Sequence, residues 1–415
     1  LLVRAYLRSG AALPAHEPGD GTSHSGAALH LFASGVARRI VKADVASLYP
    51  SLMRQHRIGS RRDRLGVLLA LVDRLVEQRL AAKARGKAAP PGSAERFTNE
   101  ALSAAMKLLV NSAYGYLGAV GLTRFADVHA ANEVTRRGRE LLWFLCRELC
   151  SRGVTLLEAD TDGVYFAVPE GFEEADERRV VAEVAALLPS LVHLEFDGRY
   201  AAMLSHEPKN YALARHDGQI VLRGVAFRSS RAEPFGEAFL RRAVACLLTG
   251  DILGVREAYA STVTALRRRE IPTFDVTARV RLTKSVAQYE VTRAHRRELP
   301  YEAVLACGRA GWGPGERVRV YRATGGRAGL FVDPDDEPSG AVAGGGAGGP
   351  DPRDYDAEYY VRLLRDTFAS RLVRALTPAD FAEVVADPEQ PSLFAASLRD
   401  AKPILTVWLD PLAER

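Results

Sequence analysis

The sequence predicts an α+β chain in which helices and antiparallel strands are divided among two or three subdomains. Apolar residues recur at helical spacing in three long stretches before residue 150. Two β-branched runs then flank Asp162-Gly163, a dipeptide typical of a β-hairpin turn. The chain has 415 residues, which is too many for one ordinary hydrophobic core, so we expect more than one subdomain.

The elements follow in order along the chain. A strand at residues 39–43 leads into Asp44, and two helices at 63–85 and 94–113 are joined by Pro90-Pro91-Gly92, with Ser93 as the N-cap of the second. This pair predicts a helical hairpin. The remaining expected elements are a helix at 128–150, a hairpin at 154–168, a helix at 172–190, strands over 194–228, a mostly helical pattern from 234 that includes a helix at 356–376, and a flexible Gly-rich loop at 339–350.

Composition speaks against several classes of protein. With 26% charged and 47% hydrophobic residues, the chain resembles neither a disordered tail nor a collagen. Its 4 cysteines form no CxxC pair, so we expect neither a disulfide framework nor a zinc site. No apolar run approaches the ~20 residues of a membrane span. We therefore expect an intracellular protein without a membrane partner, cytoplasmic and nucleoid-associated if prokaryotic. Because residue 1 is Leu, we also expect a piece of a longer protein.

Charge is distributed unevenly along the chain. Residues 333–415 contain 16 acidic and 8 basic side chains, a net charge of −8. The overall net charge is +5, so the first 332 residues carry a net charge of +13. Residues 54–87 are the most basic segment, with 10 basic and 3 acidic side chains. Such a basic body suits a polyanion such as nucleic acid or a nucleoside triphosphate. An Arg-rich solvated surface explains the charge equally well.

Three carboxylates stand at places where acids are otherwise uncommon. Asp44 ends an apolar strand, and Asp160 and Asp162 flank Thr161 on a tight turn between two apolar strands. Clustered carboxylates repel one another unless a cation joins them, and hard oxygen ligands favour Mg²⁺. The acidic turn alone would be weak evidence for a metal site. The turn together with the segment DVASLYPS at 44–51 is much stronger evidence.

Here the sequence resembles the polymerase region of family B (alpha-like) DNA polymerases. Residues 44–51 match motif A (DxxSLYPS), residues 107–115 match motif B (KxxxNSxYG), and residues 160–162 begin motif C (DTDS). Weaker matches occur at residues 135–139 (TxxGR), 209–211 (KxY), 25–27 (the YxGG/A element, with His24 in place of Tyr) and 355–372 (the DYxYY helix). The resemblance covers nearly the whole chain. The family's exonuclease domain would lie upstream of it.

The resemblance implies a right-hand polymerase fold. It places an antiparallel-sheet palm with helices at residues 1–60 and 114–231, a two-helix fingers hairpin at 61–113, and a mainly helical thumb at 232–415. The implied activity is template-directed 5′→3′ DNA synthesis from dNTPs on primer–template DNA. The implied cofactors are two Mg²⁺ ions, with Mn²⁺ as a substitute. An upstream exonuclease domain or a sliding clamp would be a further partner.

The family's motifs also imply roles for single residues. Asp44 and Asp162 would bridge the two metals, the carbonyl of Val45 would be a further ligand, and Asp160 would be an outer catalytic carboxylate. The residues expected around the nucleotide are Ser47, Leu48, Tyr49, Arg79, Lys83, Lys107, Asn111 and Tyr114. The residues expected to contact DNA are Gly115, Lys209, Tyr211, Arg223 and Lys284.

The basic residues would grip the triphosphate, and Tyr49 under the sugar would exclude a 2′-hydroxyl. Arg79 and Lys83 share one helix face by their spacing, yet they also suit an ordinary solvated face, and neighbouring Arg residues compete for the role. Tyr49 and Tyr114 equally suit core packing.

Four positions depart from the family pattern. Glu158 replaces a Tyr, Gly163 a Ser, Pro208 a Lys, and Arg223 a Lys. We expect Glu158 to add a carboxylate near the metals and to raise the pKa of its neighbours. Two alternatives therefore stay open: an inactive polymerase fold that binds DNA, and a primase-like or template-independent nucleotidyltransferase.

Overall fold

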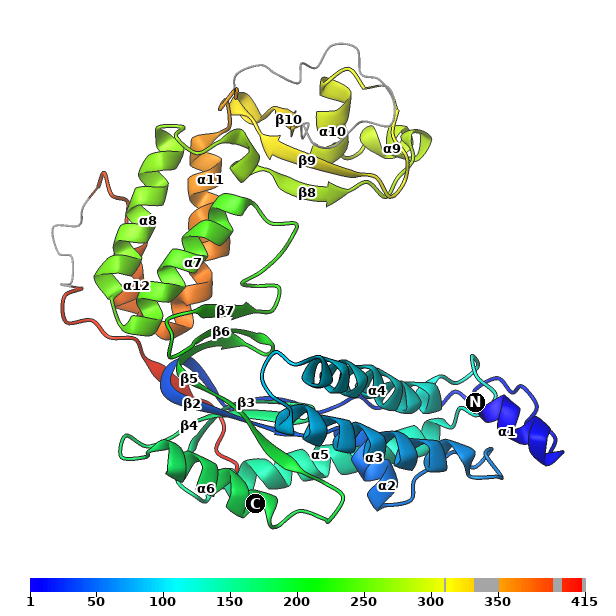
Figure 1. Ribbon diagram of the computed structural model, residues 1–415. Helices are drawn as coiled ribbons and strands as arrows, with labels where there is room; N and C mark the ends of the chain where they lie inside the picture. Colours follow the sequence, from blue (N-terminus) through cyan, green and yellow to red (C-terminus); the bar gives the residue numbers. More distant parts are fainter. Residues whose placement is uncertain (310, 332–350, 391–397, 413–415) are drawn as a thin grey trace. The chain divides into compact units, whose positions relative to one another are not determined.

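The structure is a computed structural model that describes residues 1–309, 311–331, 351–390 and 398–412. The predicted mixture of helices and antiparallel strands is confirmed (Figure 1). The chain divides into two compact units: residues 1–33, 39–199 and 407–415 form the first, and residues 34–38 and 200–406 form the second. The Gly-rich stretch expected as a loop at 339–350 lies outside the described residues.

The first unit is built on an antiparallel sheet. Its strands, in sheet order, are β1 (Leu29–Leu31), β3 (Thr155–Asp160), β4 (Gly163–Ala167) and β2 (Ala33–Val45), with β5 (Leu194–Glu207) beside β2. Strands β2 and β5 each continue along the chain into the second unit. Helices α5 (Val128–Cys150) and α6 (Glu174–Ala185) lie along one face of the sheet (Figure 1). The hydrophobic core of this unit joins these helices to β2, β3 and β4.

The predicted helical hairpin is present, and its second helix is longer than expected. It consists of α3 (Val67–Ala88) and α4 (Ala94–Gly118). The Ser93 hydroxyl caps α4 by accepting a hydrogen bond from the backbone N–H of Arg96 at 3.1 Å, as predicted. Since α4 continues five residues beyond 113, Tyr114 and Gly115 lie within the helix. The short helix α2 (Leu48–Gln55) packs against both helices of the hairpin, α3 and α4.

Helix α3 begins later than the apolar pattern suggested because Asp63 acts as a structural acceptor. Its carboxylate accepts hydrogen bonds from the Tyr6 hydroxyl at 2.8 Å and from the Leu68 N–H at 2.6 Å. Tyr6 belongs to α1 (Leu2–Ser9), a helix that the sequence did not predict. Leu2 and Tyr6, like Val3 and Leu7, recur at helical spacing, but the helix spans only 8 residues and Tyr6 is its one buried residue, so the signal was too short to be recognised.

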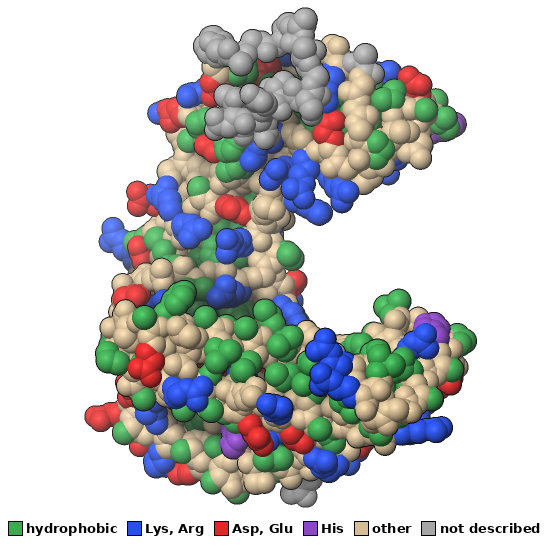
Figure 2. Space-filling view, turned by 45° about the vertical axis from the view of Figure 1, so that its right-hand side comes forward, with side chains coloured by type: hydrophobic (Ala, Val, Ile, Leu, Met, Phe, Trp, Pro, Cys, Tyr) green, Lys and Arg blue, Asp and Glu red, His purple; other side chains and the backbone are tan. Residues whose placement is uncertain are grey.

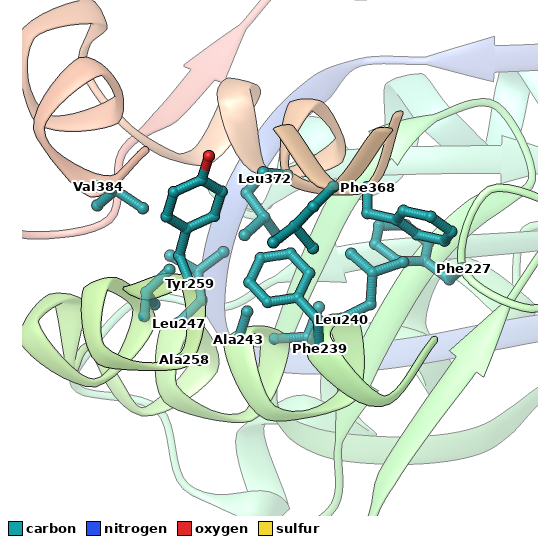
Figure 3. Close-up of a cluster of buried hydrophobic side chains, with 14 of the residues drawn as sticks. Phe227, Phe239, Leu240, Ala243, Leu247, Ala258, Tyr259, Phe368, Leu372 and Val384 are labelled. Atoms are coloured by element: carbon teal, nitrogen blue, oxygen red, sulfur yellow. The ribbon is translucent and has the colours of Figure 1, made fainter. Parts of the chain in front are cut away.

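The second unit combines β6 (Asn210–Ala214) and β7 (Ile220–Arg223) with a helical layer. The helices are α7 (Pro234–Thr249), α8 (Ile252–Arg267), α11 (Ala357–Leu363) and α12 (Pro378–Val384). Figure 3 shows their shared core, in which Phe239, Tyr259 and Phe368 are buried. The single helix expected at 356–376 is a helical run that changes type, from α11 through a π turn at Leu364–Phe368 to a 3-10 segment at Ala369–Ala375.

The expectation of a mainly helical pattern after residue 232 missed a second sheet. Strands β8 (Ala278–Arg281), β9 (Arg317–Arg322) and β10 (Ala328–Phe331) form an antiparallel sheet, packed by α9 (Val286–Arg293) and α10 (Leu299–Ala306). The last strand, β11 (Leu405–Val407), pairs with β2. The strands β8 and β9 alternate Arg with Val, so only one face is apolar and the hydrophobic signal is weak. No helix of the described residues is long and apolar enough to cross a membrane.

Candidate active site

The carboxylates of the two main motifs meet at one edge of the first unit's sheet. Asp44 near the end of β2 and Asp160 at the end of β3 both pair with Gly163, the first residue of β4. The carbonyl oxygen of Asp162, in the turn between β3 and β4, accepts a hydrogen bond from the Val45 N–H at 2.7 Å. The two turns are therefore fixed to each other by backbone contacts.

Both turns contain a non-glycine residue in the left-handed region. Ser47 has φ 53° and Thr161 has φ 58°. Such backbone costs energy and persists where the surrounding structure requires it. Here it lets β2 turn sharply into α2 and lets β3 turn into β4 within two residues, so that both carboxylates stay at the same edge.

A pocket of about 310 Å³ opens at this edge. It brings together ten of the predicted site residues, which come from β2, α2, α3, α4 and the β3–β4 turn. They are Asp44, Ser47, Leu48, Tyr49, Arg79, Lys83, Lys107, Asn111, Tyr114 and Asp162. Residues over 100 positions apart in the sequence thus line one cavity. Thr161, Glu195 and Asp197 also line it.

The two motif carboxylates hold their protons more tightly than usual. Burial, together with the negative charge of Asp44, raises the pKa of Asp162 to about 6. Burial also raises the pKa of Asp44, although the nearby ammonium of Lys42 opposes the shift. A bound cation would reverse both shifts, because it favours the charged carboxylates.

Three cations reach the pocket from the helical hairpin. The Arg79 guanidinium, largely buried, donates a hydrogen bond to the Ser47 hydroxyl, and burial lowers its pKa. The Lys83 ammonium forms an ion pair with Glu195 at 2.5 Å. Lys107 is exposed and makes no ion pair with any described residue. Arg79 and Lys83 are four residues apart on α3, and both line the pocket.

The aromatic residues of motifs A and B pack against each other at the pocket. The rings of Tyr49 and Tyr114 lie 4.4 Å apart between centroids, and burial raises the pKa of Tyr114 to about 12. Gly138 of α5 allows the close approach of Tyr49, since a Cβ there would lie 3.0 Å from the ring. The Tyr114 hydroxyl lies 2.8 Å from Nε2 of His24, at the position where the family element has Tyr.

Other predicted site residues lie outside the lining of this pocket. Asp160 and Val45 stand directly beside the carboxylate edge, while Gly115 is exposed on α4, where a Cβ would meet nothing within 4 Å. The predicted DNA contacts Lys209, Tyr211, Arg223 and Lys284 belong to the second unit. Lys284 is held in an ion pair with Glu298 at 2.5 Å.

Lys209 and Arg223 are brought together within the second unit. Tyr211 pairs with Arg223 between β6 and β7, and Lys209 occupies the turn before β6 with φ 63°. Gly224 has φ +83°, and a Cβ there would lie 2.2 Å from the carbonyl oxygen of Lys209. Only glycine permits this approach.

Glu158 does not act as we expected. Its side chain is 2% exposed within β3, and it is absent from the pocket lining. The charged groups that shift the pKa of Asp162 are Asp44, Lys42 and Asp160, and Glu158 is not among them. Glu158 lies inside β3, opposite Leu31 of β1 and Tyr165 of β4, and not in the turn that carries Asp162.

Sequence reasoning missed Lys42, Glu195 and Asp197. Lys42 lies two residues before Asp44 on the same face of β2, and its ammonium is 3.3 Å from an Asp44 carboxylate oxygen and 2.6 Å from one of Asp197. The period of two along a strand was the available signal for Lys42. Glu195 and Asp197 alternate in the same way along β5, yet nothing in the sequence placed β5 beside β2.

The donor set suits a hard divalent cation. The pocket offers carboxylate oxygens from Asp44, Asp162 and Asp197, and the Lys42 ammonium already places a positive charge between two of them. Among the described residues, no group of three His, Cys, Asp or Glu side chains is close enough to form a metal site as it stands. Asp44 and Asp197 are each paired with the Lys42 ammonium.

Comparison with known proteins identifies the family. The model of DNA polymerase family B matches residues 54–300, which is more than half of the chain and includes motifs B and C. DNA polymerase 1 of Pyrococcus abyssi (strain GE5 / Orsay) is 31% identical over 263 residues, covering 57% of this chain and 34% of that protein. The DNA polymerase of Thermococcus sp. (strain 9oN-7) is 27% identical over 368 residues, covering 82% of this chain and 46% of that protein.

A solved structure shows the same fold. The family B DNA polymerase from Pyrobaculum calidifontis matches with a TM-score of 0.66 at 21% identity, covering 90% of this chain and 49% of that one. The chain therefore spans less than half the length of these relatives. Family B polymerases use divalent metals and act on DNA and dNTPs. Because the family model covers most of the chain, this protein belongs to DNA polymerase family B.

Proposed function

We propose that the chain catalyses template-directed 5′→3′ DNA synthesis. A primer 3′-hydroxyl loses its proton and attacks the α-phosphorus of a dNTP, the bond from the α-phosphorus to the bridging oxygen breaks, and pyrophosphate leaves. The observation that carries the proposal is the single pocket that gathers Asp44, Asp162, Tyr49 and Lys107. In this proposal residues 1–60 and 114–231 are the palm, 61–113 the fingers, and 232–415 the thumb.

The carboxylates Asp44 and Asp162, with the carbonyl of Val45, would hold two Mg²⁺ ions, for which Mn²⁺ would substitute. When bound, these ions supply charge to the attacking and leaving oxygens. The chain itself orders the site, since the backbone contact between Val45 and Asp162 fixes the two ligands relative to each other. Asp160 would act from the outer side of the turn.

The cations of the pocket would bind the triphosphate. Lys107 is exposed and faces solvent, so it is the residue most available to an incoming phosphate. Lys83 is held by Glu195, and a triphosphate would compete for it because it carries more negative charge than one carboxylate. Ser47, Leu48 and Asn111 would line the nucleotide around them.

Discrimination of the sugar would rest on Tyr49. Its ring centroid lies 4.4 Å from that of Tyr114, and α5 approaches the ring closely at Gly138. These two contacts would limit how far the ring can turn away from a ribose 2′-hydroxyl. Tyr49 would therefore favour deoxynucleotides.

A basic strand pair in the second unit supports DNA as the partner. Arg279 is directly opposite Arg319, and Arg281 is directly opposite Arg317. Like charges at opposed positions destabilise a sheet, so a polyanion bound over this face would relieve the repulsion. Arg279, Arg281 and Arg317 make no ion pair with any described residue. Figure 2 shows Lys and Arg side chains gathered on the lobe that contains β8, β9 and β10.

Primer extension tests this function. A labelled primer–template is incubated with Mg²⁺ and each dNTP in turn, beside Asp162→Asn and the matched variant Asp160→Asn. We expect template-matched extension that Asp162→Asn abolishes and Asp160→Asn reduces less. Extension without a template would indicate a template-independent nucleotidyltransferase. Duplex binding with no extension in Mg²⁺ or Mn²⁺ would leave a DNA-binding module.

A further inference from the structure

Lys42 introduces a positive charge into the carboxylate edge of the pocket. It lies two residues before Asp44 on β2, so both side chains project from the same face of the strand. Its ammonium is 2.6 Å from Asp197 and 3.3 Å from Asp44. One lysine thus bridges a carboxylate of β2 and a carboxylate of β5.

The arrangement around Lys42 is spatially specific. Its side chain is 21% exposed and that of Asp44 29%, so this pair is partly shielded from solvent, whereas the Asp197 side chain is 47% exposed. A Cβ at residue 163 would lie 2.7 Å from the Asp44 carboxylate oxygen and 3.5 Å from Cε of Lys42. Gly163 therefore leaves the space that the Asp44 carboxylate occupies, while the lysine stem would be in ordinary contact with such a Cβ.

The carboxylates are partly neutralised without any bound ion. The carboxylates of the pocket belong to Asp44, Asp162, Glu195 and Asp197, and Lys83 already neutralises Glu195. Lys42 then serves Asp44 and Asp197, the two carboxylates closest to it. The carboxylates of Asp44, Asp162 and Asp197 repel one another at this edge, and the ammonium offsets part of that repulsion.

We propose that Lys42 is a resident counter-ion of the catalytic pocket, which stabilises the metal-free site and competes with divalent metal for Asp44 and Asp197. The inference rests on the proposed function, because it takes Asp44 as a metal ligand. Lys42 is a positioning residue: it acts through the carboxylates and contacts no substrate. A metal ion that binds Asp44 has to displace the ammonium, and the chain should consequently bind divalent metal more weakly than its carboxylates alone would allow.

Metal binding measured without DNA or nucleotide tests the inference directly. Free Mn²⁺ is followed by electron paramagnetic resonance during titration of the full chain, of Lys42→Met and of Lys42→Arg, which keeps the charge. We expect Lys42→Met to bind Mn²⁺ on the order of tenfold more tightly and Lys42→Arg to stay near the wild type. The metal-free Lys42→Met protein should also melt at a lower temperature, and Mn²⁺ should restore it. Unchanged or weaker Mn²⁺ binding by Lys42→Met would overturn the inference.

A second measurement needs no variant and so does not depend on the folding of one. Acetylation of lysines by acetic anhydride is mapped by mass spectrometry with and without saturating Mg²⁺. Displacement of the ammonium should raise the reactivity of Lys42 severalfold, while Lys284, paired with Glu298 in the other unit, serves as the internal control. Equal reactivity of Lys42 in both conditions would count against displacement.

Primer extension by the same proteins separates this inference from the proposed function. Extension by the wild type with no change in Mn²⁺ affinity on Lys42→Met would leave the polymerase function standing and refute the counter-ion. Tighter Mn²⁺ binding by Lys42→Met in a chain that extends no primer would support the counter-ion and refute the polymerase function.

Discussion

The contact between Gly163 and Asp44 allows the placement of a proposed metal ligand to be tested by one methyl group. In the Gly163→Ala protein the new Cβ would lie 2.7 Å from the Asp44 carboxylate oxygen, whereas ordinary contacts begin at 3.4 Å. The carboxylate must therefore retreat by roughly 0.7 Å. Gly163 has no positive φ, so alanine brings no backbone strain of its own.

The two consequences of this shift differ in size. A carboxylate at the end of a short side chain can rotate, so the free energy of unfolding should fall by only about 1 kcal/mol, at the low end for overpacking. Displacement of a reacting or ligating group by about 1 Å costs about 100-fold in rate. We therefore expect primer extension to slow about 10- to 100-fold at fixed Mg²⁺, together with weaker Mn²⁺ binding.

The assay is single-turnover primer extension over a range of Mg²⁺ concentrations, with urea denaturation of the same proteins. Gly171→Ala is the matched control, because a Cβ at residue 171 would meet nothing within 4 Å. Wild-type extension and Mg²⁺ dependence in Gly163→Ala would show that the position of the Asp44 carboxylate does not limit the reaction. A large loss of stability would instead show that the effect on rate arises from misfolding.

Three further outcomes are expected. Gly138→Ala places a Cβ 3.0 Å from the Tyr49 ring, so ribonucleotide incorporation relative to deoxynucleotide should change severalfold in competition assays, and an unchanged ratio would count against Tyr49 as the sugar contact. The pKa of Asp162 is raised from 3.8 to about 6, so the folded metal-free chain binds this carboxyl proton more tightly than the unfolded chain does. The free energy of unfolding should therefore fall as the pH rises from 3.8 to about 6. After solvent screening the loss is on the order of 1–2 kcal/mol, and it should vanish in Asp162→Asn when both are unfolded by urea in EDTA. Arg281→Glu and Arg317→Glu should each weaken duplex binding and lower the salt dependence of log K by about 1, measured by fluorescence anisotropy, and an unchanged slope would exclude that face.

Most of the first unit's site could be predicted because its residues come from motifs with fixed local spacing. Asp44, Asp162, Tyr49 and Lys107 all line the predicted pocket. Residues contributed by neighbouring strands could not be predicted, since the sequence does not say that β5 lies beside β2. Asp197 was missed for that reason.

The fold shows the same division between local and non-local signals. The long amphipathic helix α5 was predicted at its observed bounds, because 3.6-residue periodicity is a local signal. The sheet β8–β9–β10 was missed because its strands are short and carry Arg on one face. The start of α3 was misplaced because it depends on a tertiary contact between Asp63 and Tyr6.

The departures from the family pattern are best understood by their position in the structure. Glu158 is buried in β3 outside the pocket lining, whereas Gly163 and the lysine at residue 42 both contact Asp44. A serine at residue 163 would carry a Cβ to 2.7 Å from the Asp44 carboxylate oxygen, so the glycine is what leaves that oxygen its present position. The departure at residue 163 therefore bears on the placement of a motif carboxylate, whereas Glu158 lies outside the pocket lining.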